Sequence, residues 1–167
     1  MNFLISSREF KNHIFKKENI FFYVFVVTIF FLDRLSKLQI INNLNEASYY
    51  VNDFINLELI WNIGIGFGLL STVDSLFYNL VTLIIGLVIL YLFYLLILSD
   101  KIGKLIYSII IGGALGNFYD RLVYRAVPDF IDLHYNNFHW FVFNLADIFI
   151  SIGIIFLILE GFLRKSK

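Results

Sequence analysis

The sequence predicts an α-helical integral membrane protein with four transmembrane helices, on the evidence of its composition and its apolar segments. The chain has 167 residues, of which 59% are hydrophobic and only 16% are charged, whereas soluble domains are about one quarter charged. A membrane span needs roughly 20 mostly apolar residues, and four segments meet this requirement. They cover about residues 20–41, 75–99, 102–119 and 140–159. We expect a single membrane domain over residues 1–167.

The first apolar segment is similar to a secretory signal peptide, because basic residues precede it. No small-residue cleavage site follows; Asp33, Arg34 and Lys37 occupy its second half instead. We therefore predict a retained span. Asp33 and Lys37 stand four residues apart, a spacing that favours an ion pair on a helix. We expect this pair to have a structural or supporting role.

The distribution of charge in and around the other spans predicts the orientation of the chain. Residues 75–99 carry no charge, Lys104 lies near the start of the third span, and Asp147 lies inside the fourth. Lysine and arginine accumulate before the first span, between the second and third spans, and after the fourth. Because cytoplasmic regions are enriched in these residues, both termini are predicted to be cytoplasmic.

Two outer segments, residues 42–74 and 120–139, connect the spans on the other side of the membrane. The first has no lysine or arginine, and the β-rich pattern of residues 49–61 predicts a few short strands on the outer surface. It leads to Asn62, which glycines follow at positions 64, 66 and 68. These glycines indicate either a turn or a backbone surface that a ligand can approach closely.

Composition excludes several classes of function. The formal net charge is zero, so nothing points to nucleic acid as a partner. The absence of cysteine excludes disulfides, thiolate metal sites and a cysteine nucleophile. Ionisable groups within membrane spans are costly, and each is therefore a hypothesis for a functional site.

Asp147 is the most informative of these groups. It lies seven residues after Trp140, which would place it about 10 Å along a helix that starts at the membrane interface. Asn144 and Ser151 would share its helical face. This polar stripe is either a structural hydrogen-bond cluster or, with a partner carboxylate, a catalytic site.

Asp129 is the natural partner, although alone it could be an ordinary loop aspartate. It follows Pro128 and stands 18 residues before Asp147, so the chain has room to fold back. Two carboxylates held close together share one proton. The ionised carboxylate can take a proton from an attacking water, and the protonated one can donate to the amide carbonyl oxygen.

Residues 112–121 close the third span with several glycines that allow close helix contact. Asn117 and Arg121 point the same way, since they are four residues apart. This segment serves either helix packing with an ion pair at the helix end, or Asn117 and Arg121 brace the two carboxylates or the substrate backbone. Asp120 and Arg121 are expected to pair with other groups at the outer surface.

A metal site is the alternative for the polar residues of the second outer segment. His134 and His139, with Asp129 and Asp132, carry suitable ligand atoms. Metal ligands on one element usually follow a regular spacing, and these residues have none. The sequence therefore predicts no metal and no cofactor.

The chain resembles the lipoprotein signal peptidase family, also called signal peptidase II, in five motifs that occur in the family's order. The family patterns D-x-x-[ST]-K, N-x-G-x-[AS]-F-G, G-G-A-x-G-N-x-x-D-R, V-x-D-F and F-N-x-A-D correspond to residues 33–37, 62–68, 112–121, 127–130 and 143–147. Each motif alone is weak, but five in order are specific and extend over nearly the whole chain. The chain departs from the usual pattern at Gly66, Pro128 and Ile148.

The resemblance implies an aspartyl endopeptidase whose catalytic residues are Asp129 and Asp147. It implies supporting or substrate-binding roles for eight further residues, Asp33, Lys37, Asn62, Gly64, Asn117, Asp120, Arg121 and Asn144. The implied substrates are diacylglyceryl-modified bacterial prolipoproteins, cut before the lipid-modified cysteine by a water that two carboxylates activate. Globomycin-type inhibitors would block the reaction.

The resemblance also implies a location and a shape. The protein would be a multi-pass monomer of the bacterial inner membrane, in contact with membrane lipid, with its active site near the periplasmic face. A small outer β-cradle and a short interfacial helix would complete the fold.

Two other classes of function remain open from the residues alone. A small proton-coupled carrier also needs intramembrane acids, but internal repeats are absent and the charges lie toward the outer surface. A non-catalytic assembly or lipid-binding factor would tolerate replacement of Asp129 or Asp147 by asparagine, whereas a protease would not.

Overall fold

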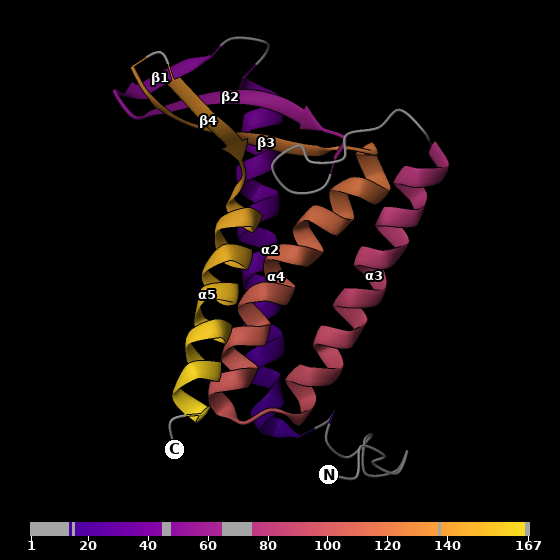
Figure 1. Ribbon diagram of the computed structural model, residues 1–167. Helices are drawn as coiled ribbons and strands as arrows, with labels where there is room; N and C mark the ends of the chain where they lie inside the picture. The colour runs from indigo at the N-terminus through magenta and orange to yellow at the C-terminus, as the bar shows by residue number, and fades with distance from the viewer. Residues whose placement is uncertain (1–13, 15, 45–47, 65–74, 137, 166–167) are drawn as a thin grey trace.

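The computed structural model is a bundle of long helices with an antiparallel sheet across one end, here called the sheet end (Figure 1). The structure describes residues 14, 16–44, 48–64, 75–136 and 138–165. The elements are α2 (Lys17–Asn43), β1 (Tyr49–Asn52), β2 (Ile55–Asn62), α3 (Ser75–Leu98), α4 (Lys101–Tyr124), β3 (Val127–Tyr135), β4 (Phe138–Phe143) and α5 (Leu145–Lys165). The strands follow one another in the sheet in the order β1-β2-β3-β4.

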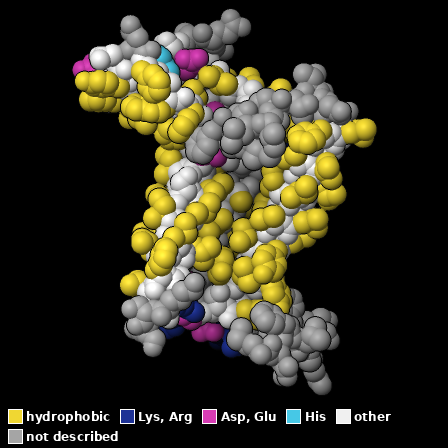
Figure 2. Space-filling view, in the orientation of Figure 1, with side chains coloured by type: hydrophobic (Ala, Val, Ile, Leu, Met, Phe, Trp, Pro, Cys, Tyr) yellow, Lys and Arg dark blue, Asp and Glu magenta, His cyan; other side chains and the backbone are white. Residues whose placement is uncertain are grey.

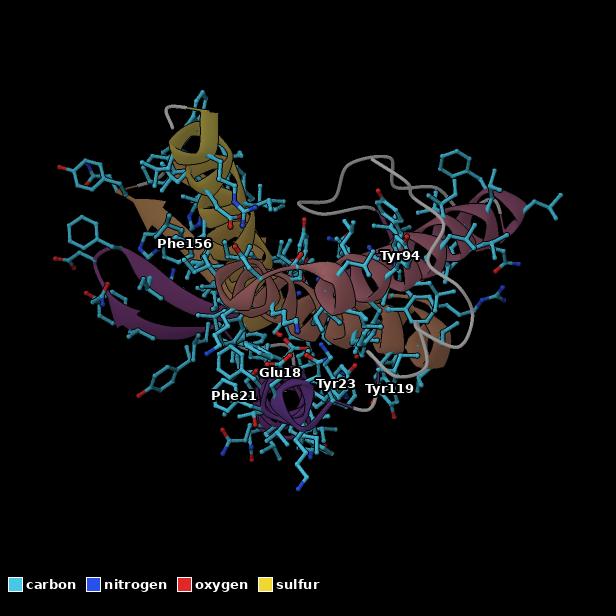
Figure 3. The ribbon with its side chains drawn as sticks, turned by 90° about the horizontal axis from the view of Figure 1, so that it is seen from below. Glu18, Phe21, Tyr23, Tyr94, Tyr119 and Phe156 are labelled. Atoms are coloured by element: carbon cyan, nitrogen blue, oxygen red, sulfur yellow. The ribbon has the colours of Figure 1, made fainter. Side chains whose placement is uncertain are left out.

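Helix α4 is central and contacts α2, α3 and α5. Viewed from below, it lies between α2 and α5 (Figure 3). Its glycines permit this close packing: a Cβ on Gly112 would lie 2.7 Å from the Cβ of Ile29 in α2. A Cβ on Gly113 would lie 2.6 Å from the carbonyl oxygen of Ala146 in α5. Small residues therefore hold together the helices that carry the candidate site.

Three helical segments of the described chain are long and apolar enough to cross a membrane: Leu76–Leu98, Lys101–Tyr124 and Leu145–Arg164. Hydrophobic side chains cover the length of the bundle, whereas charged side chains gather toward its two ends (Figure 2). The first predicted span, residues 20–41, corresponds to α2 (Lys17–Asn43), and its membrane crossing stays a prediction. The expected short interfacial helix is not defined within the described residues.

Two helix borders differ from the predicted ones. The third span was expected to end near residue 119, but α4 continues to Tyr124, and Arg125 follows with a positive φ of 56°. The fourth span was expected to begin near Trp140, but this residue belongs to β4, and α5 begins at Leu145. The aromatic segment before α5 is apolar enough to belong to a membrane helix, but it forms β4 and pairs with β3.

The predicted strands between residues 49 and 61 are confirmed as β1 and β2. The second outer segment also forms a strand, β3, which lies beside β2 so that Ile60 is opposite Asp129. Because β4 then leads almost directly into α5, the first turn of that helix returns to the same end of the bundle. This path brings distant polar residues together at the sheet end.

Candidate active site

Asp129 and Asp147 both lie where the sheet meets the helices. Asp129 is in β3 and is 2% exposed, so it is not the loop aspartate that the sequence suggested as one alternative. Asp147 lies in the first turn of α5. The expected position 10 Å inside that helix is wrong, because the residues that follow Trp140 are strand and not helix.

Asn144 connects the two carboxylates. Its Nδ2 donates to Asp129 Oδ1 at 2.5 Å, and its backbone N–H donates to Asp147 Oδ2 at 3.2 Å. The Asp147 N–H donates in return to Asn144 Oδ1 at 3.0 Å. This reciprocal arrangement is a capping box, which satisfies free N–H groups at a helix start. The sequence motif thus both begins α5 and positions the carboxylates.

Asn62 holds the other oxygen of Asp129. Its Nδ2 donates to Asp129 Oδ2 at 2.8 Å, while its Oδ1 accepts a hydrogen bond from the Gly64 N–H at 2.8 Å. Burial, and then the nearby charge of Asp147, raise the pKa of Asp129 from 3.8 to about 6, against the two asparagine hydrogen bonds, which lower it. Asp129 therefore retains a proton at a pH where an exposed aspartate has lost it.

Lys37 is the centre of a buried polar network behind Asp147. Its side chain is not exposed at all, and the three hydrogens of its ammonium match three acceptors. The acceptors are Asp33 Oδ2 at 2.7 Å, Asn117 Oδ1 at 2.8 Å and Asp120 Oδ2 at 2.8 Å. The predicted ion pair between Asp33 and Lys37 is therefore present, in a larger network than the spacing suggested.

Asn117 and Asp33 connect this network to the start of α5. Asn117 Nδ2 donates to Asp147 Oδ1 at 2.8 Å, so this amide lies between Lys37 and Asp147. Asp33 Oδ1 accepts a hydrogen bond from the Ala146 N–H at 3.0 Å. The first turn of α5 is thus held to both α2 and α4.

Arg34 is a member of the network that the sequence analysis did not place in the site. Its guanidinium donates to Asp120 Oδ1 and lies 4.7 Å from the ring centre of Tyr119. Asp120 therefore pairs with two cations of α2 inside the protein, and not at the outer surface as expected. The sequence signal for Arg34 was its charge within an apolar helix. Its partner Asp120 is 86 residues away, so the spacing of residues could not reveal the pair.

Arg121 contacts the segment that follows β2. Its Nη2 donates to the Gly64 carbonyl oxygen at 2.7 Å, and its Nη1 donates to the Asn117 carbonyl oxygen at 3.4 Å. Gly64 is thereby held by Arg121 and Asn62. The later glycines of this motif, Gly66 and Gly68, lie outside the described residues.

An apolar groove with a volume of about 260 Å³ opens beside Asp147. Its walls come from the end of β4 and one face of α5, and its residues are Phe141, Phe143, Asp147, Ile148, Ser151, Ile152 and Ile155. Ser151, predicted to share the face of Asp147, lines this groove. A carboxylate at the edge of an apolar groove is suited to act on a substrate with an apolar portion.

Chemically, the site presents two carboxylates with different hydrogen-bond partners, and burial raises the pKa of Asp129 to about 6. A carboxylate pair of this kind can supply both a general acid and a general base. In the described residues, the group with ligand atoms close enough for a metal ion is Asp132, His134 and His139, which includes neither Asp129 nor Asp147.

Comparisons with known proteins agree with this fold. The model of the family described as Signal peptidase (SPase) II matches residues 25–163. The lipoprotein signal peptidase of Pelagibacter ubique (strain HTCC1062) is 49% identical over 86% of this chain and 89% of its own length. The lipoprotein signal peptidase of Rickettsia akari (strain Hartford) is 44% identical over 80% of this chain and 70% of its own.

A solved structure described as a bacterial membrane enzyme, determined by the in meso method at 2.3 Å resolution, superposes with a TM-score of 0.73. It is 29% identical, and the match covers 87% of this chain and 89% of the solved chain. The family match, the two relatives and the common fold agree, and this chain belongs to the signal peptidase II family.

Proposed function

We propose that this protein is an aspartyl endopeptidase that removes the signal peptide from diacylglyceryl-modified prolipoproteins, cutting before the lipid-modified cysteine. The observation that carries the proposal is the pair Asp129 and Asp147, joined through Asn144 beside an apolar groove. The names of the two relatives support the substrate class.

The two carboxylates have distinct roles in this proposal. Asp129 holds the shared proton, because burial and the charge of Asp147 raise its pKa to about 6. Asp147 stays ionised and takes a proton from the water that attacks the scissile carbonyl. Asp129 donates its proton to the carbonyl oxygen, and a proton then passes to the leaving amine.

The surrounding polar residues position this pair. Lys37 and Asn117 hold Asp147 from behind, and Asn62 and Asn144 hold both oxygens of Asp129. Both carboxylates are thereby fixed before substrate arrives, which lowers the reorganisation that the reaction requires. Three further residues act on the pair indirectly. Asp33 and Asp120 bond to Lys37, and Asp33 also bonds to the start of α5. Arg121 bonds to Gly64.

In the membrane, α2 would cross together with the three apolar helices, which gives four spans in all. Its buried charges are compatible with this, because Asp33, Arg34 and Lys37 all bond to groups inside the bundle. The start of α2 and the end of α5 lie at the end opposite the sheet (Figure 1). With the termini in the cytoplasm, the sheet end faces the periplasm at the inner membrane, and we propose that one chain suffices for activity.

The groove beside Asp147 would receive an acyl chain of the diacylglyceryl group. Ile152 lines the groove and is 40% exposed, so Ile152→Trp should fill it without disturbing the core. We expect KM for the lipidated substrate to rise roughly tenfold, as for the loss of about 1.4 kcal/mol of binding. Ile154→Trp is the matched control, because Ile154 is 44% exposed and does not line the groove. Equal KM values for the two variants would contradict this use of the groove.

The experiment that tests the function is cleavage of a diacylglyceryl-modified prolipoprotein by the purified protein in detergent. Wild type, Asp129→Asn and Asp147→Asn are compared, each with and without chelator and globomycin. We expect wild-type cleavage that chelator leaves unchanged and globomycin blocks, and no cleavage by either variant. Unchanged cleavage in either variant would refute the assignment of the pair. A folded wild type that does not cleave would favour a carrier or a non-catalytic factor.

A further inference from the structure

One carboxylate and two imidazoles meet on the sheet, away from the catalytic pair. Asp132 and His134 belong to β3, and His139 of β4 lies directly opposite His134 in the ladder. One ligand atom from each of the three residues lies within 4.8 Å of the others. Figure 2 shows a histidine beside acidic side chains at the sheet end.

Two atoms of this cluster are buried without a hydrogen-bond partner. They are Asp132 Oδ1 and His134 Nδ1, and their side chains are only 2% and 9% exposed. Buried polar atoms in folded proteins almost always have a partner. His134 Nδ1 lies 3.7 Å from Asp132 Oδ2, so it is directed into the cluster without forming a hydrogen bond there.

We propose that Asp132, His134 and His139 bind a divalent transition-metal ion, of which Zn²⁺ is the best fit. Two imidazole nitrogens and one carboxylate oxygen are a ligand set that zinc accepts. Bonds of about 2.0–2.1 Å at tetrahedral angles place neighbouring ligand atoms about 3.3 Å apart. The Asp132 Oδ2 atom lies 2.8 Å from His139 Nδ1 and 3.7 Å from His134 Nδ1. Small side-chain rotations therefore bring all three atoms to the distances of a zinc site.

The surroundings support such a site. Asn56 Nδ2 donates to Asp132 Oδ2 at 3.3 Å, and hydrogen bonds of this kind orient the ligands of metal sites. The His139 side chain is 54% exposed, so an ion can enter from solvent, and water can occupy the fourth position. The two imidazole rings stack with their centroids 5.2 Å apart, so both histidines face the same part of the sheet.

The ion would join β3, which carries Asp129, to β4, which leads to Asn144 and α5. It would thus add stability to the hairpin without being required for cleavage, which is why chelator is expected to leave cleavage unchanged. The sequence analysis predicted no metal because it sought regular spacing on one element. Ligands that meet across a β-ladder leave no such spacing.

The test is Zn²⁺ binding to the untagged full-length protein in detergent, after removal of metal with a chelator, by titration calorimetry. A polyhistidine tag must be absent, since it would bind the ion itself. We expect one Zn²⁺ per chain, and an affinity at least tenfold lower in His139→Ala and in Asp132→Asn. Glu58→Gln is the control, because it also removes one acid from the sheet and Glu58 is exposed. This variant should bind Zn²⁺ as wild type does.

A second readout is the visible absorbance of bound Co²⁺, which reports tetrahedral coordination by nitrogen and oxygen. Wild type should show this band and His139→Ala should lose it. Because the His139 side chain is 54% exposed, we expect its replacement to leave the fold intact, and a failure of Asp132→Asn to fold does not affect the test. Equal Zn²⁺ affinity in wild type and His139→Ala would overturn the proposal, as would wild type that binds no Zn²⁺. Neither measurement depends on cleavage.

Discussion

Replacement of Asn62 by alanine tests whether Asp129 holds the catalytic proton. Asn62 Nδ2 donates to Asp129 Oδ2 at 2.8 Å, and this hydrogen bond lowers the pKa of Asp129 against the effects of burial and of Asp147. A hydrogen bond to a charged group contributes ~1.5–3 kcal/mol. Since about 1.4 kcal/mol corresponds to one pH unit, and water can partly replace the half-buried amide, Asn62→Ala should move the titration of Asp129 by about one pH unit to higher pH.

The assay is kcat/KM for the lipidated substrate as a function of pH. The active form needs Asp129 protonated and Asp147 ionised, so cleavage falls on the alkaline side as Asp129 loses its proton. We expect this alkaline limb to lie about one pH unit higher in Asn62→Ala than in wild type. Asn56→Ala is the matched control from the same strand, because Asn56 contacts Asp132 and not Asp129. An alkaline limb that stays in place, or moves to lower pH, would refute the assigned role of Asp129.

Three further predictions concern stability and packing. The folded state raises the pKa of Asp129 from 3.8 to about 6, so the stability that its proton provides is full below the lower value and is lost as the pH rises through the upper one. This loss is ~3 kcal/mol near neutral pH. The Tm of Asp129→Asn should therefore rise relative to that of wild type between about pH 4 and pH 7. Tm values that change with pH in parallel in the two proteins would contradict the raised pKa. Lys37→Met leaves buried Asp33 without its cation and Asp120 with Arg34 alone, and should cost ~3–5 kcal/mol; denaturation in detergent should show a large loss of Tm, and a wild-type Tm would show that the network is dispensable. Gly113→Ala places a Cβ 2.6 Å from a backbone oxygen of α5 and should lower both Tm and cleavage, whereas Gly161→Ala, which has nothing within 4 Å, should do neither.

Local sequence patterns determined much of the architecture. Apolar runs marked the positions of all four long helices, because burial in lipid or protein requires them. The β-rich pattern near Tyr49 marked two strands, and a four-residue spacing indicated the pair of Asp33 and Lys37. These features depend on residues that are neighbours in the chain, so their signals survive in the sequence.

Helix borders near the site were less predictable for a physical reason. The aromatic residues of β4 are apolar enough to continue a membrane helix, and only their pairing with β3 makes them a strand. The start of α5 depends on the capping box of Asn144 and Asp147. Because β4 was expected to be the start of the helix, Asp147 was expected several residues inside α5 and not in its first turn.

The sequence by itself determined that this chain is a helical membrane protein with a few acids that it must shield. Only the tertiary structure decided how those acids are used. One partner of Asp120 is Arg34, 86 residues earlier, and Asn117 donates a hydrogen bond to Asp147, 30 residues later. The histidines of β3 and β4 meet across a ladder. Such contacts depend on how helices and strands pack, and hydrophobic periodicity, which reports only which face of an element is buried, carries no information about them.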